Sequence, residues 1–227
     1  LYPHKNIKEF FQNGLRFAWY SLLSGAMAAV VLLPAYLGIM QTSSAKLDFP
    51  KELWYGTFGN IFSRHLLGTT PLTMAVDDSK INLYCGILTL LMAGFYLAVR
   101  EIRLIDKIRR LLLLVFLFFS FNMPVLGYIW HGFHDQYGIP NRYAFLYIFA
   151  LLAMAYEGYC VLARGQRKIS MGIYTSVILC GVLIEAAIQT VTVKMEMKTV
   201  YATLAAIIVY MACFGLYQKK ILRKKVF

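Results

Sequence analysis

The chain has 227 residues, of which 59% are hydrophobic and 15% are charged, and its mean hydropathy is +0.60. This composition is too apolar for an ordinary soluble domain and indicates an integral membrane protein. The formal net charge is +12, but the basic residues occur in short blocks between apolar runs. Their arrangement argues against a nucleic-acid-binding protein, in which a basic face would be studded with aromatic residues.

Six apolar stretches are long enough to cross a bilayer core, which is about 30 Å thick and takes about 20 residues of helix. We therefore predict an all-α fold, a single bundle of membrane-spanning helices over residues 1–227. We also expect this chain to be an internal fragment of a longer protein. The predicted spans are 17–40, 81–99, 111–130, 143–163, 169–189 and 199–217.

The basic residues predict the orientation of the bundle. Sixteen of the 23 lysines and arginines lie at the two ends of the chain and in the second and fourth of the five loops between spans. The other seven lie in the remaining loops, which together contain more residues. Because basic residues accumulate on the cytoplasmic side, both ends of the chain are predicted to be cytoplasmic. Residues 41–80 and 131–142 then face outward.

The outer loop 41–80 carries one helical pattern. Its apolar residues recur every three to four positions over residues 52–67, while its polar residues fall elsewhere on the turn. We predict an amphipathic helix over residues 52–67 that lies in the outer membrane interface. Arg64 and His65 belong to this helix and are candidate contacts for a phosphate group.

Two carboxylates, Asp77 and Asp78, come just before the second predicted span. Paired acids can bind a divalent cation or act as acid and base, because one carboxylate raises the pKa of its neighbour. Adjacent aspartates at the start of a helix are also an ordinary N-terminal cap. The sequence leaves both interpretations open.

Prolines interrupt two of the predicted spans. Pro34 predicts a kink in the first span, and Asn122 to Pro124 predict a break in the third, near its outer end. Non-helical backbone at membrane depth is tolerated where protein or a water-filled cavity satisfies it. The break therefore suggests a cavity beneath the outer loop 131–142.

Two carboxylates lie inside predicted spans, Glu157 in the fourth and Glu185 in the fifth. An ionisable group in a membrane helix is costly and is by default a candidate functional group. We expect Glu157 to face the interior of the bundle, whereas Glu185 lies close enough to the outer surface to reach it by snorkelling. The four cysteines fall in apolar runs and are interpreted as packing residues.

The densest polar cluster is the run HGFHDQYGIPNRYAFLYI, residues 131–148. Three interpretations compete for it. His131, His134 and Asp135 have the side chains of a metal site, but their short loop spacing is a weak signal. Alternatively, aromatic residues and Arg142 anchor the loop at the membrane surface. In the third interpretation Arg142 holds a phosphate, while Asp135 or a histidine supplies acid-base capacity.

Several runs resemble the YfhO-type family of bacterial membrane proteins. The most specific is HGFHDQYGIPNRYAFLYIFALLAMAYE, preceded by NMPVLGYIW, and the earlier run GAMAAVVLLPAYLGIMQTSSAK is also similar. Together they cover roughly residues 20 to 160. The resemblance implies a polytopic glycosyltransferase of the GT-C class. Such an enzyme transfers sugar from a polyprenyl phosphate to an envelope polymer such as teichoic acid, outside the bacterial cytoplasmic membrane.

Under this resemblance the substrate-binding candidates are on the predicted outer side: Arg142, Asn141, His131, His134, Arg64 and His65. The catalytic candidates are Asp135, Asp77 and Asp78, although enzymes of this class carry their acid in an earlier outer loop that we expect to precede Leu1. No cofactor or metal is firmly implied. The alternative is a transporter or lipid flippase that uses Glu157 and Glu185.

Overall fold

The computed structural model describes residues 7–41, 49–69, 81–133, 141–164, 177, 180–181, 184 and 197–218. Of these residues 78% are helical and none is in a strand, which confirms the predicted all-α fold. The chain divides into two compact units, Leu1–Asp48 and Phe49–Phe227. The prediction that residues 1–227 form one bundle stays a prediction.

The first unit contains one long helix, α1 (Ile7–Met40). It begins ten residues before the predicted span 17–40, and Pro34 lies inside it. At 1.5 Å per residue its 34 residues measure about 51 Å, more than a bilayer core requires. The α1 helix is therefore long and apolar enough to cross a membrane.

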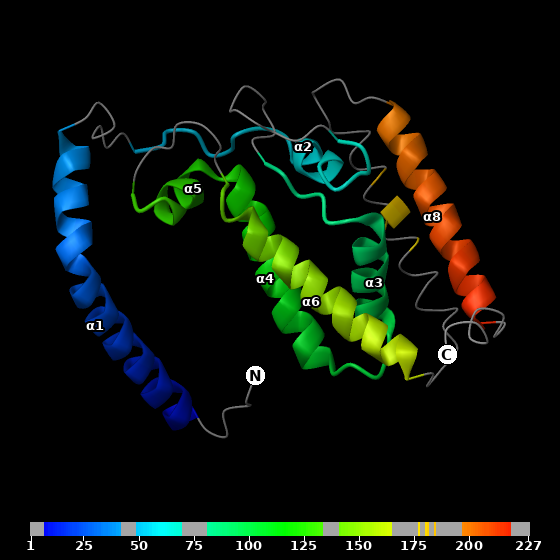
Figure 1. The fold of residues 1–227 in the computed structure, drawn as a ribbon, viewed down its shortest axis with the longest axis horizontal. Coiled ribbons are helices and arrows are strands. Elements are labelled where there is room, and N and C mark those ends of the chain that lie inside the picture. Colours follow the sequence, from blue (N-terminus) through cyan, green and yellow to red (C-terminus); the bar gives the residue numbers. More distant parts are fainter. Residues whose placement is uncertain are drawn as a thin grey trace. The chain divides into compact units, whose positions relative to one another are not determined.

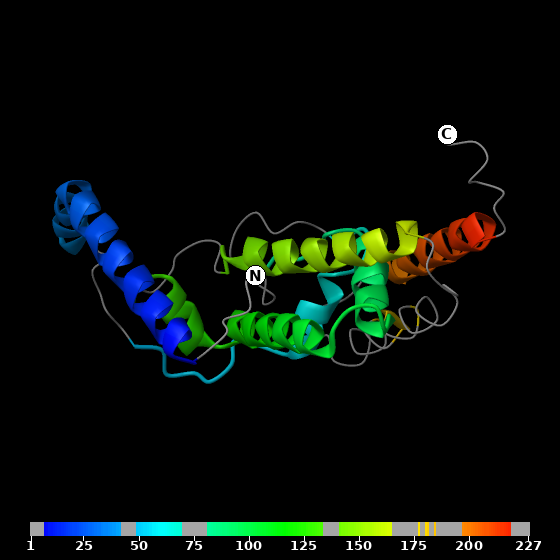
Figure 2. The same cartoon turned by 90° about the horizontal axis from the view of Figure 1, so that it is seen from below.

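The second unit contains helices α2 to α6 and α8, shown in Figure 1. The α6 helix lies along α4 in Figures 1 and 2, and α3 contacts both α6 and α8. A core of buried apolar side chains joins α3, α4 and α6, and a second one joins α3 to α8. The helices are α2 (Phe58–Ser63), α3 (Ile87–Ala98), α4 (Leu104–Asn122), α5 (Pro124–Trp130), α6 (Ala144–Ala163) and α8 (Met197–Gln218).

Among the described residues three helices are long and apolar enough to span a membrane, namely α1, α6 and α8. The α4 and α5 helices make a fourth candidate if they are taken together as one broken span. The predicted span 169–189 lies largely outside the described residues.

The α4 and α5 helices meet at a bend of 103°, which confirms the predicted break at Asn122 to Pro124. Met123 adopts an extended conformation between them, and Pro124 is the first residue of α5. Proline lacks the N–H that a continuous helix needs and disfavours helical backbone in the residue before it. The break follows directly from this local chemistry.

The predicted interfacial helix 52–67 is wrong in length, because only α2 is helical there. Residues 59–61 and 63–66 are buried, with Asn60 2% and Leu66 2% exposed, whereas Leu53 and Trp54 before α2 are 60% and 39% exposed. The residues before α2 are not helical. They are bound to the end of α4, because the Tyr55 N–H donates to the backbone oxygen of Asn122 at 2.9 Å. At the other end, the Leu67 N–H donates to the Thr203 hydroxyl on α8 at 2.9 Å. The segment is thus packed into the second unit.

The predicted span 81–99 is also shorter than expected. The α3 helix has 12 residues, about 18 Å, which is less than a bilayer core. It starts after Gly86, whose φ of 95° is incompatible with a right-handed helix. Before it, Ile81 and Leu83 are fully buried while Asn82 and Tyr84 are exposed. This alternation is typical of an extended segment that buries one face.

The α3 and α6 helices approach closely at Gly158. A Cβ atom at this position would lie 2.8 Å from the backbone oxygen of Met92 and 3.4 Å from the backbone nitrogen of Tyr96. Backbone atoms cannot move aside as a flexible side chain can. We expect Gly158→Ala to force the two helices apart and to lower the free energy of unfolding by about 1–2 kcal/mol.

Thermal unfolding in detergent micelles measures this effect. The matched control is Gly215→Ala on α8, where an added Cβ would meet no atom within 4 Å. Alanine is the better helix former, so the control variant should keep or slightly raise the unfolding temperature. Equal losses in the two variants would contradict the close approach at Gly158.

Candidate functional site

The candidate site lies where α4, α5 and α6 meet, and Tyr143 is its centre. The Tyr143 ring stacks between Trp130, at 4.9 Å between ring centroids, and Phe121, at 5.4 Å. Its hydroxyl lies 2.9 Å from both the Ser120 backbone oxygen and the Asn141 Oδ1 atom. Burial raises the pKa of Tyr143 above its usual range, so its hydroxyl stays protonated as a donor.

Asn141 joins the end of α4 to the start of α6. Its Nδ2 atom donates to the Phe121 backbone oxygen at 3.0 Å, and its own backbone oxygen accepts from the Ala144 N–H at 2.9 Å. It has a φ of 57°, a left-handed conformation that asparagine tolerates better than most residues. Asn141 is 3% exposed, so its buried amide links the end of α4 to the start of α6.

Arg142 stands directly after this joint, two residues before α6 begins, and is exposed. Asn141 and Tyr143, its two neighbours, are both buried. The start of α6 is favourable for an anion, because helix N-termini carry partial positive charge and unpaired N–H groups. The arrangement holds the backbone of Arg142 firmly and leaves its side chain at the surface.

His131 ends α5 and lies near Tyr143, with 6.0 Å between the ring centroids. Its Nδ1 atom is 2.6 Å from the Gly127 backbone oxygen. A carbonyl oxygen can only accept, so Nδ1 carries the hydrogen and Nε2 is the acceptor nitrogen of the neutral ring. The structure therefore brings His131, Asn141 and Arg142 together around Tyr143, as their nearness in the sequence predicts.

Arg64 and His65 are buried at 8% and 3% exposure, away from the surface position predicted for them. The His65 Nδ1 atom lies 3.1 Å from the Ile61 backbone oxygen and its Nε2 atom 3.2 Å from the Tyr147 hydroxyl. Burial lowers the pKa of His65 to about 4 and also lowers the pKa of Arg64. His65 is therefore neutral at physiological pH.

Glu157 on α6 forms an ion pair with Arg110 on α4. The Arg110 guanidinium also lies over the ring of Tyr96 on α3, 5.6 Å from its centroid. The carboxylate predicted inside the fourth span is thus paired with a cation that lies before the third predicted span 111–130. The ion pair and the contact with Tyr96 together link three helices at the end of the bundle away from Arg142.

Five of the predicted site residues lie outside the described residues: Asp77, Asp78, His134, Asp135 and Glu185. Their proposed roles stay predictions. Within the described part of the chain, no group of three histidine, cysteine, aspartate or glutamate side chains is placed to hold a metal ion.

Sequence reasoning missed the structural importance of Tyr143, Tyr147 and Asn122. Tyr147 lies on α6 and Tyr143 directly precedes that helix, four residues earlier, and both pack against Phe121. A spacing of four residues in a helical region predicts that the two rings share one face, so the sequence contained a signal for this contact. Asn122 was noted only as part of a break, yet its side chain hydrogen-bonds both backbone groups of Gly56.

Comparison with known proteins identifies the family. Neither the curated proteins nor the solved structures include a match to this chain. A family model described as bacterial membrane protein YfhO matches residues 1–227. The chain therefore belongs to the YfhO family of bacterial membrane proteins.

Proposed function

We propose that this chain forms part of an integral membrane glycosyltransferase of the GT-C type. It would transfer sugar from a polyprenyl-phosphate donor to an envelope polymer such as teichoic acid, at the outer face of the bacterial cytoplasmic membrane. The observation that carries the proposal is the exposed Arg142, held between two buried residues at the start of α6. A guanidinium is suited to phosphate because its N–H groups form a rigid fork.

In the proposed reaction an acceptor hydroxyl attacks the anomeric carbon of the donor sugar. The bond between that carbon and the phosphate oxygen breaks, and polyprenyl phosphate leaves with the electron pair. A carboxylate takes the proton from the attacking hydroxyl, and Asp135, Asp77 and Asp78 are the candidates in this chain. Arg142 stabilises the negative charge on the departing phosphate.

The proposed mechanism gives Arg142 a larger effect on transfer than other surface arginines. We expect Arg142→Ala in the full-length protein to lower sugar transfer by about tenfold, the loss of one charge-assisted hydrogen bond. Arg142→Lys should retain part of the activity, because lysine keeps the charge but loses the fork. Incorporation of labelled sugar into envelope polymer by membrane vesicles measures both.

The matched control is Arg164→Ala, an exposed arginine at the opposite end of α6. This variant should transfer sugar at the normal rate. Unchanged transfer in Arg142→Ala would overturn the proposal. Labelling of an Arg142→Cys variant from the cytoplasmic side alone would also overturn it, because the phosphate site must face outward.

A further inference from the structure

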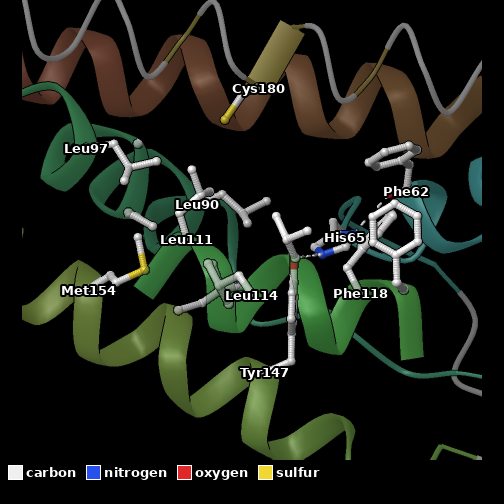
Figure 3. A pocket seen from close by; sticks show the side chains of 15 residues that line it. Phe62, His65, Leu90, Leu97, Leu111, Leu114, Phe118, Tyr147, Met154 and Cys180 are labelled. Atoms are coloured by element: carbon white, nitrogen blue, oxygen red, sulfur yellow. Dashed lines mark hydrogen bonds between the residues drawn. The ribbon is translucent and has the colours of Figure 1, made fainter. Parts of the chain in front are cut away.

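A cavity of about 300 Å³ lies in the second unit, apart from the Arg142 site (Figure 3). Residues of α3, α4 and α6 form most of its wall, and nearly all of them are apolar. The polar exceptions are His65 and Tyr147, besides the thiol of Cys180. In Figure 3 His65 and Tyr147 lie toward the side of the cavity that Phe62 and Phe118 line, and Leu97 and Met154 lie toward the opposite side. The interior therefore suits a hydrocarbon chain with one polar end.

The cavity opens on the outward face of α4. Leu111, Val115 and Phe119 line it and are still 46%, 44% and 42% exposed. They are spaced by four residues and so share one helix face. Because α4 belongs to a candidate membrane span, lipid is the expected neighbour of this exposed apolar face. The natural source of an occupant is then the bilayer, by lateral entry.

The polar end of the cavity offers an acceptor. The His65 Nδ1 atom faces two backbone oxygens, of Ile61 at 3.1 Å and Phe62 at 3.3 Å, so it carries the ring hydrogen. The Nε2 atom then accepts from the Tyr147 hydroxyl. Because the Tyr147 hydroxyl donates its one hydrogen to His65, its oxygen can only accept a hydrogen bond from a ligand.

This geometry discriminates between lipid head groups. A hydroxyl can donate to the Tyr147 oxygen, whereas a carboxylate or phosphate has no proton to give. An anion would also be buried without a counter-charge, since the residues that the structure places around the cavity include no lysine or arginine and His65 is neutral. We infer that the cavity binds the hydrocarbon chain of an uncharged lipid whose hydroxyl donates to Tyr147. The inference does not depend on the proposed transferase activity.

Photolabelling of the full-length protein in lipid nanodiscs tests this inference. The probes are a long-chain alcohol with a diazirine on its chain and the carboxylic acid of the same chain. We expect the alcohol to label the cavity walls on α3, α4 and α6 more strongly than the acid does. Tyr147→Phe should lower labelling by the alcohol roughly two- to tenfold, the value of one hydrogen bond, and leave labelling by the acid unchanged.

Two variants fill the cavity with a larger side chain. Ala93→Phe fills the interior, and Val115→Phe narrows the half-exposed mouth, where folding tolerates a larger residue. Both should lower labelling of the walls. Leu113→Phe is the control, an exposed position on α4 that does not line the cavity. Equal labelling by alcohol and acid, or wall labelling that persists in Val115→Phe, would overturn the inference.

Discussion

Replacement of Arg110 by methionine is expected to lower the free energy of unfolding by about 2 kcal/mol. The variant leaves the Glu157 carboxylate without its cation on α6, a candidate membrane span, where the Glu157 side chain is 44% exposed. A charged side chain at the centre of a membrane helix costs about 2.5–3.5 kcal/mol. The cost here is lower because both residues lie near the ends of their helices rather than at the centre. Arg110 lies six residues, about 9 Å, after the start of α4, and Glu157 lies six residues before the end of α6.

A second replacement separates the charge from the packing. If the unpaired carboxylate causes the loss, Glu157→Gln in the Arg110→Met background should recover most of it. Arg109→Met is the matched control, because Arg109 is 56% exposed and lies 3.8 Å from an aspartate one turn away. Such surface pairs contribute little, so its thermal unfolding in detergent should barely change. A double variant as unstable as Arg110→Met would refute this account.

The ion pair also bears on the transporter alternative. A carboxylate that couples transport to a proton must lose and regain its charge, whereas the Glu157 carboxylate forms an ion pair with Arg110 on α4. The Arg110 guanidinium is further held over the Tyr96 ring. The pairing therefore fits a structural link between α3, α4 and α6.

The sequence predicted those parts of the fold that depend on local chemistry. The long apolar runs predicted the ends of α1, α6 and α8 to within two residues. The exception is the start of α1, which lies ten residues earlier than predicted. Pro124 gave the break between α4 and α5. These features follow from helix length in a bilayer and from the missing N–H of proline. They require no knowledge of distant contacts.

The errors arose where apolar residues are buried without being helical. The apolar composition of residues 81–99 predicts a membrane helix that includes Ile81 and Leu83, yet these residues alternate with the more polar Asn82 and Tyr84. A period of two in this short run favours an extended segment. Gly86, with its positive φ, marks the boundary that was missed.

The candidate site was predictable only in part. His131, Asn141 and Arg142 are close in the sequence and remain close in the structure. The stacking of Tyr143 between Trp130 and Phe121 depends on the 103° bend between α4 and α5 and on the antiparallel packing of α4 against α6 (Figure 1). No local sequence pattern encodes either feature. The burial of Arg64 and His65 also depends on helices that are distant in the sequence.

Asn122→Ala is expected to release the segment before α2 and to lower the free energy of unfolding by about 2–3 kcal/mol. The Asn122 side chain is 2% exposed and makes two hydrogen bonds to Gly56. Its Nδ2 atom donates to the Gly56 oxygen at 2.8 Å, and its Oδ1 atom accepts from the Gly56 N–H at 3.0 Å. Each bond contributes about 1 kcal/mol, and the lost packing of a buried side chain adds to the cost.

Hydrogen exchange distinguishes this tether from a general loss of stability. The Gly56 amide donates to the Asn122 Oδ1 atom, which alanine lacks, whereas the Tyr55 amide donates to the Asn122 backbone oxygen, which alanine keeps. In Asn122→Ala the Gly56 amide should therefore exchange faster than the amides within α6. Ser63→Ala is the matched control, because this buried hydroxyl bonds only the local Asn60 oxygen, at 2.9 Å. It should lower stability by about 1 kcal/mol and leave the Tyr55 and Gly56 amides protected. If the Gly56 amide is equally protected in both variants, the Asn122 side chain does not hold the segment. The contact of the end of α4 with α2 and the segment before it would then rest on the aromatic packing of Trp54 and Phe58 against Phe119.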